Sequence, residues 1–182
     1  METNHYKLLS ITVKSTLVHT VTYFLVGLLA FTFLDYSARF SEGGLELLMR
    51  PTDHPLVMAG PLFQPLRGLL FGFAFYLLRE AYFPKGNGWL RMWAVLVIMG
   101  ILSPFGPAPG SIEGFIYTTL PLRSQLSPGM LEVLLQSLLL AFLVHYWVNN
   151  SQKRWLPWVF GILFILTILL PLAGLLASSL TS

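Results

Sequence analysis

Long continuous runs of apolar residues recur along this chain, and short polar turns or proline-rich segments separate them. Each run approaches the ~20 residues that an α-helix needs to cross a bilayer, and none shows the two-residue alternation of a membrane β-strand. The pattern therefore predicts an all-α polytopic membrane protein with a single integral membrane domain over residues 1–182. We expect a bundle of five transmembrane helices, at about residues 15–34, 61–82, 89–105, 130–148 and 155–177.

Two long proline-rich segments, 35–60 and 104–128, connect these runs on what we expect to be the outer side. The first contains the letters LELLMR, which place apolar and charged residues on opposite sides of one or two helical turns. In the second, apolar residues recur at helical spacing from Ile112 to Leu120, and Glu113 falls in the first turn, where the helix dipole favours an acid. We therefore expect both outer loops to carry short interfacial or re-entrant helices.

Small residues on the first two expected helices predict close helix packing. Gly68 and Gly72 have the small-xxx-small spacing that lets two helices approach closely, either inside one chain or between two copies. The first helix carries a stripe of small and polar residues near helical spacing, which should pack against other helices: Ser15, His19, Thr22, Tyr23, Gly27 and Ala30.

Composition supports the membrane class and removes several kinds of chemistry. The chain is 55% hydrophobic and only 10% charged, whereas a soluble domain carries about 25% charged residues. The absence of cysteine excludes thiolate metal sites, cysteine nucleophiles and disulfide exchange. The net charge of +3 comes mostly from lysines and arginines that flank the apolar runs, so it indicates topology, and we expect no nucleic acid partner.

The lysines and arginines are distributed unevenly between the two sides of the predicted bundle. Three lie on the side of the long loops, at Arg39, Arg50 and Arg123. Seven lie on the opposite side: Lys7, Lys14, Arg79, Lys85, Arg91, Lys153 and Arg154. Because the more positive side faces the cytoplasm, the N-terminus is predicted to be cytoplasmic and the C-terminus extracytoplasmic. The location is predicted to be a cell membrane, and the small size is typical of a bacterial inner membrane protein.

Arg67 is a charged residue within a predicted membrane span, and its position needs a physical explanation. No charged residue lies between Arg67 and Arg79, and these twelve helical steps rise only about 18 Å, against about 30 Å of hydrocarbon. If Arg79 is interfacial, Arg67 lies within the membrane, where arginine costs about 3 kcal/mol. We expect it to face the bundle interior or a wet cavity and to pair with Glu113 or Glu132. Contact with a lipid phosphate, across a locally thinned bilayer, is the alternative.

The remaining candidate chemistry lies around the outer loops. Guanidinium groups bind phosphate and carboxylate through paired hydrogen bonds, so the outer arginines indicate an anionic ligand. We expect an extracytoplasmic ligand site built from segments 50–67 and 110–123, although ordinary lipid contact would use the same arginines. The candidate ligand-binding residues are Arg50, Asp53, Gln64, Arg67, Tyr117, Arg123 and Glu132.

Three functions are compatible with this pattern. The first is a small transporter, or a transporter subunit, that binds an anionic or amphipathic ligand at the outer site. The second is a membrane-embedded enzyme that acts on a lipid or lipid phosphate, with His54 and Glu113 as the catalytic acid–base pair. His54 could instead simply cap a turn. The third is a structural or accessory subunit of a membrane complex.

Sequence motifs give no positive indication of a cofactor. One histidine with carboxylates is a weak zinc pattern, and the letters H-E-x-x-H are absent, so we expect no cofactor and no metal. The expected partners are membrane lipids, among them an anionic lipid or a small anionic ligand. A second copy of the chain and a membrane partner subunit both stay open.

Overall fold

The computed structural model describes residues 7–35, 45–84 and 86–181, and every regular element in these ranges is a helix. The long helices are α1 (Leu8–Phe33), α4 (Gly60–Leu77), α6 (Gly88–Val97), α9 (Gly129–Asn149) and α10 (Trp155–Thr181). The short ones are η1 (Leu45–Leu47), α3 (Pro55–Met58), α5 (Arg79–Tyr82), the π-helix η2 (Ile98–Leu102), α7 (Ile112–Tyr117) and α8 (Leu122–Gln125). Arg39 and Lys85, which contribute to the predicted charge asymmetry, lie outside the described residues.

Three stretches of helix are long and apolar enough to cross a membrane: Leu8–Phe33, Leu122–Asn149 and Trp155–Ala177. The predicted all-helical class is confirmed, and these three stretches fit the predicted membrane location. The apolar helix Gly88–Leu102 is shorter, and α4, a continuous helix of 18 residues, carries the polar residues Gln64 and Arg67.

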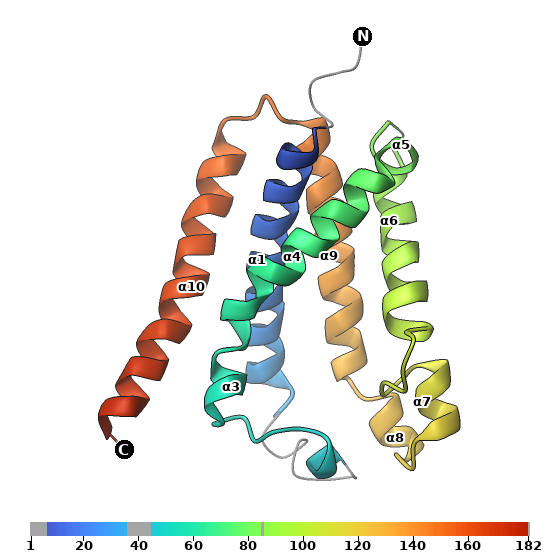
Figure 1. Cartoon of the computed structure of the whole chain (residues 1–182), viewed down its shortest axis with the longest axis vertical. Coiled ribbons are helices and arrows are strands. Elements are labelled where there is room, and N and C mark those ends of the chain that lie inside the picture. Colours follow the sequence, from blue (N-terminus) through green and yellow to red (C-terminus); the bar gives the residue numbers. More distant parts are fainter. Residues whose placement is uncertain (1–6, 36–44, 85, 182) are drawn as a thin grey trace.

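Consecutive long helices run in alternate directions, so the two termini lie at opposite ends of the bundle (Figure 1). Helix α1 is central and packs against α4, α9 and α10, whereas α6 packs mainly against α9. We call the end that carries α5 and the 150–154 turn the basic end, and the end that carries α3, α7 and α8 the loop end (Figure 1).

Helices α1 and α4 cross at backbone contact. A Cβ atom on Gly68 would lie 2.6 Å from the Thr16 Cα, and one on Gly72 would lie 2.5 Å from the Thr12 Cα. Both distances are far below van der Waals contact, so only glycine fits at these positions. The predicted close helix contact is confirmed, and it forms within the chain.

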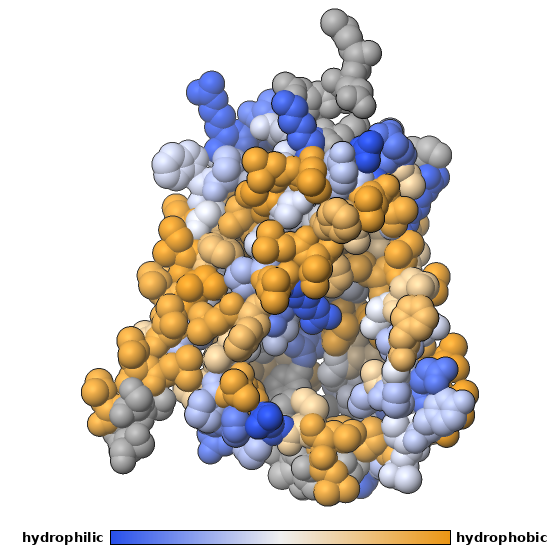
Figure 2. All heavy atoms as spheres, in the orientation of Figure 1, coloured by the Kyte–Doolittle hydropathy of each residue, from blue (hydrophilic) through white to orange (hydrophobic). Residues whose placement is uncertain are grey.

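Apolar side chains fill the interior and also cover the outside of the bundle. The buried core joins α1, α4, α6 and α9 through residues such as Ile11, Val18, Phe75, Met92 and Leu140. Large apolar side chains are also exposed along the outer faces, which appear as a broad hydrophobic surface in Figure 2. A surface of this kind is suited to lipid contact.

Helix α1 begins at Leu8, ahead of the span start predicted at residue 15. His19 therefore lies in the middle of the helix, about 16 Å from Leu8 and about 21 Å from Phe33 along the axis. The helix predicted from Ile112 is present as α7, with most of its apolar side chains exposed at the loop end.

Candidate functional site

His19 joins three helices in the middle of the bundle. Its side chain is 1% exposed. The Nε2 atom lies 3.1 Å from Oε1 of Gln64 on α4, and the Nδ1 atom lies 3.4 Å from Nε2 of Gln136 on α9. A neutral imidazole that carries its proton on Nε2 satisfies both contacts, because Nε2–H donates to Gln64 and Nδ1 accepts from Gln136. We call this arrangement the His19 bridge.

Each of the three helices supplies polar side chains three or four residues apart, which places them on one side of the helix. The pairs are His19 and Tyr23 on α1, Gln64 and Arg67 on α4, and Glu132 and Gln136 on α9. A Cβ on Gly27 would lie 3.7 Å from a Glu132 carboxylate oxygen, and a Cβ on Gly60 would lie 3.7 Å from the Tyr23 hydroxyl. The polar interior therefore continues from His19 toward the loop end.

Arg67 lies beside this bridge but outside the buried core. Its guanidinium carbon is 5.5 Å from the centroid of the Phe71 ring, and its side chain is exposed. In the described part of the chain the ion pair is Arg79–Glu80, so the predicted pairing of Arg67 with Glu113 or Glu132 is not formed. The reason is placement: Glu113 is carried by α7 at the loop end, and Glu132 lies against Gly27 on α1.

A small cavity of about 60 Å³ opens in front of the His19 bridge, and we call it the Arg67 pocket. Four helical segments line it, with His19 from α1, Arg67 and Phe71 from α4, Leu96, Gly100 and Ile101 from α6 and η2, and Val133, Gln136, Ser137 and Leu140 from α9. None of these lining residues is acidic, so the Arg67 charge dominates the pocket. Figure 2 shows hydrophilic atoms in a hollow near the middle of this face, with hydrophobic atoms around them.

The α6 side of the pocket has an unusual backbone. The helix continues into the π-helix η2, in which Ser103 N–H donates to the Ile98 carbonyl at 2.8 Å. π-Helical turns occur frequently at functional sites. Gly100 in this turn faces open space, since a Cβ there would meet nothing within 4 Å. Behind the pocket, Trp93 Nε1–H donates to Ser137 Oγ at 3.2 Å and ties α6 to α9.

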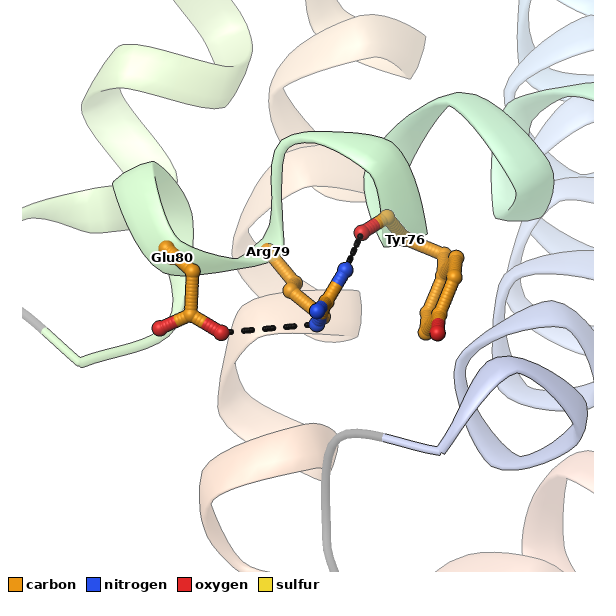
Figure 3. Close-up of polar contacts among 3 residues, drawn as sticks. All are labelled: Tyr76, Arg79 and Glu80. Carbon is orange, nitrogen blue, oxygen red and sulfur yellow. Dashed lines mark hydrogen bonds and ion pairs between the residues drawn. The ribbon is translucent and has the colours of Figure 1, made fainter. Parts of the chain in front are cut away.

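The basic end uses its charges differently (Figure 3). The Arg79 guanidinium donates to the Tyr76 carbonyl at 3.1 Å and covers the Tyr76 ring at 4.4 Å from its centroid. Arg79 Nε also lies 3.4 Å from a Glu80 carboxylate oxygen. Lys14 Nζ donates to Ser151 Oγ at 2.6 Å. These cations are held by the protein itself.

The first group of loop-end candidates is built around His54. Its Nδ1 accepts the Leu56 N–H at 3.1 Å and caps α3, and its Nε2 lies 3.3 Å from Nη1 of Arg50. The capping role is therefore confirmed. The cap uses the Nδ1 lone pair, so the proton of a neutral His54 sits on Nε2. In this tautomer the ring has no free lone pair, and Nε2–H does not accept a hydrogen bond from Arg50. Arg50 and Asp53 are exposed on the surface beside it.

The second group of loop-end candidates surrounds Gln125, a residue that sequence reasoning missed. Its Oε1 accepts the Gly110 N–H at 2.8 Å, and its Nε2 donates to the Gly114 carbonyl and to Thr118 Oγ1, both at 2.9 Å. Gly110 adopts φ +82°, a conformation that favours glycine. These bonds fold the second outer loop against itself.

The structure separates the predicted catalytic pair. His54 caps α3, and Glu113 lies in the first turn of α7, on the other side of the loop end (Figure 1). Tyr117 and Arg123, on α7 and α8, are exposed. Of the predicted ligand residues, Gln64, Arg67 and Glu132 are brought together around the three-helix interior, while Arg50, Asp53, Tyr117 and Arg123 lie on the loop-end surface.

Comparison with known proteins assigns no family to this chain. No family model, no curated protein and no solved structure matches the chain. In the described ranges no group of three histidine, aspartate or glutamate side chains could hold a metal ion. The chemistry that the pocket offers is one guanidinium with its hydrogen-bond donors, the polar side chains of His19, Gln136 and Ser137, and an apolar remainder, which is suited to an anionic group.

Proposed function

We propose that this chain is a small membrane transporter, or the membrane subunit of one, that binds an anionic amphipathic ligand in the Arg67 pocket. The observation that carries the proposal is a mid-helix arginine with no ion-pair or hydrogen-bond partner among residues 7–35, 45–84 and 86–181. Arg67 lies about 10 Å from Gly60 and about 15 Å from Leu77 along α4, and its side-chain contact is the Phe71 ring. A charge inside a membrane needs a partner, and an anionic ligand would supply one to Arg67.

The proposal includes five membrane crossings, with the N-terminus in the cytoplasm and the C-terminus outside. It is supported by the alternating directions of the five long helices (Figure 1) and by the gathering of Lys14, Arg79, Arg91, Lys153 and Arg154 at the basic end. In this arrangement the Arg67 pocket lies near the middle of the bilayer. Secondary transporters commonly bind substrate near that depth.

The proposed site differs in depth from the outer-loop site that the sequence favours. Arg67 contributes the charge, Gln64 fixes His19 behind it, and Glu132 lies in the same polar interior outside the pocket lining. We assign Arg50, Asp53, Tyr117 and Arg123 to the extracytoplasmic surface, where they would contact lipid head groups and water.

Native mass spectrometry tests this function directly. The purified protein is mixed with dodecanoate or dodecyl phosphate, and the fraction that carries one adduct is measured for wild type, Arg67→Glu and Arg67→Ala. We expect a discrete adduct in wild type and its loss in both variants, because each removes the guanidinium.

Arg123→Ala is the matched control, since Arg123 is an exposed arginine at the loop end. It should retain the adduct. Equal retention by all four proteins would show that the detergent-like probes bind nonspecifically, and the proposed function would then be abandoned.

A further inference from the structure

We propose that the ligand reaches the Arg67 pocket sideways from the lipid, between α4 and α6, as a lipid with one small oxoanion head: a carboxylate or a phosphate monoester. We call the two sides of the opening, α4 on one side and α6 with η2 on the other, its lips. The acyl chain stays outside, against these apolar lips. This inference rests on the proposed function and deepens it, because it names the ligand class and the route.

The arrangement of the helices gives the direction of the opening. Helices α1 and α9 form the floor, where His19 is fully enclosed. Helix α4 packs on α1 and α6 packs on α9, so the two lips of the pocket belong to separate helix pairs. Figure 2, which views the bundle across its helices, shows the hollow from the side. A ligand that uses this opening comes from the lipid.

The size and charge of the pocket select the head group. A volume of about 60 Å³ accommodates a few heavy atoms, and no lining residue is acidic. A carboxylate or phosphate can accept two parallel hydrogen bonds from the Arg67 guanidinium. A second N–H of the Gln136 amide is left over after its contact with His19 at 3.4 Å.

The rim of the pocket favours a ligand whose remaining part, beyond the head group, is apolar. Phe71 on one lip and Leu96 and Ile101 on the other are apolar. Close to these residues in sequence, Leu70 on α4 is 65% exposed and Met99 on η2 is 54% exposed. A water-soluble anion gains nothing from this rim, whereas an acyl chain is in contact with it along its length.

The Gly100 position allows the opening to be closed without disturbing the core. A Cβ there would meet nothing within 4 Å, and the residue lines the pocket. Gly100→Leu should therefore fill the entrance and leave the fold intact. Gly161, on α10, also has open space around a built Cβ and does not line the pocket, so Gly161→Leu is the matched control.

The test uses stearic acid that carries a mid-chain photoactivatable diazirine, with the protein in phosphatidylcholine nanodiscs. Labelled peptides are mapped by mass spectrometry. We expect labelling to concentrate on the two lips, near Leu70 and Met99. It should fall about tenfold in Gly100→Leu and in Arg67→Gln, and stay unchanged in Gly161→Leu. Two unrelated variants guard against a folding defect in one of them.

Competitors separate the possible outcomes. Displacement by dodecanoate alone would identify a carboxylate, and displacement by dodecyl phosphate alone would identify a phosphate monoester; either supports the inference. If acetate or inorganic phosphate competes as well as its alkyl counterpart, lateral access by a lipid is overturned, while an Arg67-dependent anion site stands. If labelling is spread evenly over all helices and is insensitive to Arg67→Gln, both the inference and the proposed function fail.

Discussion

Arg67 and Arg79 belong to the same stretch of chain, twelve residues apart, yet the protein treats them in opposite ways. Arg79 is held by a backbone carbonyl, an aromatic ring and a neighbouring carboxylate (Figure 3). Arg67 has an aromatic ring and an open pocket. A charge that the fold satisfies contributes to structure, whereas a charge that the fold positions but does not satisfy is available to a ligand.

Substitution of Gly68 tests whether the position of Arg67 depends on the α1–α4 crossing. It should give the largest loss of stability among these variants. In Gly68→Leu the new side chain meets the Thr16 backbone, which cannot move aside as a flexible side chain would. Forcing the helices apart should cost about 3 kcal/mol or more. Thermal unfolding in detergent measures the loss. Gly161→Leu should unfold like wild type, and an unchanged melting temperature for Gly68→Leu would contradict the close crossing.

His19→Ala tests the floor of the Arg67 pocket. The substitution leaves the Gln64 and Gln136 amides without their shared partner in the interior, which should cost about 1–3 kcal/mol. Stability is again measured by thermal unfolding, together with dodecanoate binding, which should weaken.

The neighbouring Thr20 provides the control for His19. Its buried Oγ1 has no hydrogen-bond partner in the described part of the chain, so Thr20→Val should be neutral or stabilising. If His19→Ala lowers stability no more than Thr20→Val does, the hydrogen bonds of the His19 bridge do not stabilise the fold, and the pocket floor is held by packing alone.

The sequence predicted the features of the fold that depend on a pattern within one helix, and it missed those that depend on several helices. Apolar length and the Gly68–Gly72 spacing gave the helical class and the close crossing, because both are read within one helix. The His19 bridge required knowing which faces of three helices meet. His19 belongs to the polar stripe predicted on the first helix, but no pattern within one helix indicates its partners in another.

The partner of Arg67 was mispredicted for a physical reason. Glu113 and Glu132 were chosen because they are acidic and near the same side of the bundle. The fold directs Glu132 toward Gly27 and uses Gln125 to fold the second loop onto itself, away from α4. Opposite charges in a sequence indicate which ion pairs would be stable if their side chains met. The path of the backbone decides whether they meet.

Replacing each arginine by glutamine sharpens the comparison, with a smaller effect on stability. Arg79→Gln should lower stability by about 0.5–1 kcal/mol, because it removes a hydrogen bond to a carbonyl and a cation–π contact, while its pair with the exposed Glu80 adds little. Arg67→Gln should lower stability less than Arg79→Gln does, because among the described residues it removes only a longer cation–π contact, 5.5 Å to the Phe71 centroid against 4.4 Å to the Tyr76 centroid. Thermal unfolding and dodecyl phosphate binding are measured for both.

The two arginine variants should therefore separate stability from binding. Arg67→Gln should lose the ligand and keep the fold, and Arg79→Gln should keep the ligand and lose some stability. A parallel loss of both properties in Arg67→Gln would place Arg67 with Arg79, as a structural residue.

His54→Ala should give the smallest effect and extends the comparison to the loop end. Removing the cap of α3 should cost about 0.5–1 kcal/mol, because the Leu56 N–H loses its acceptor. Hydrogen exchange should quicken at the Leu56 amide, and binding at the Arg67 pocket should be unchanged, because α3 contributes no lining residue. If His54→Ala instead abolished binding while Arg67→Ala did not, the ligand would sit among the outer loops, as the sequence first indicated, and the contrast between the two arginines would concern packing alone.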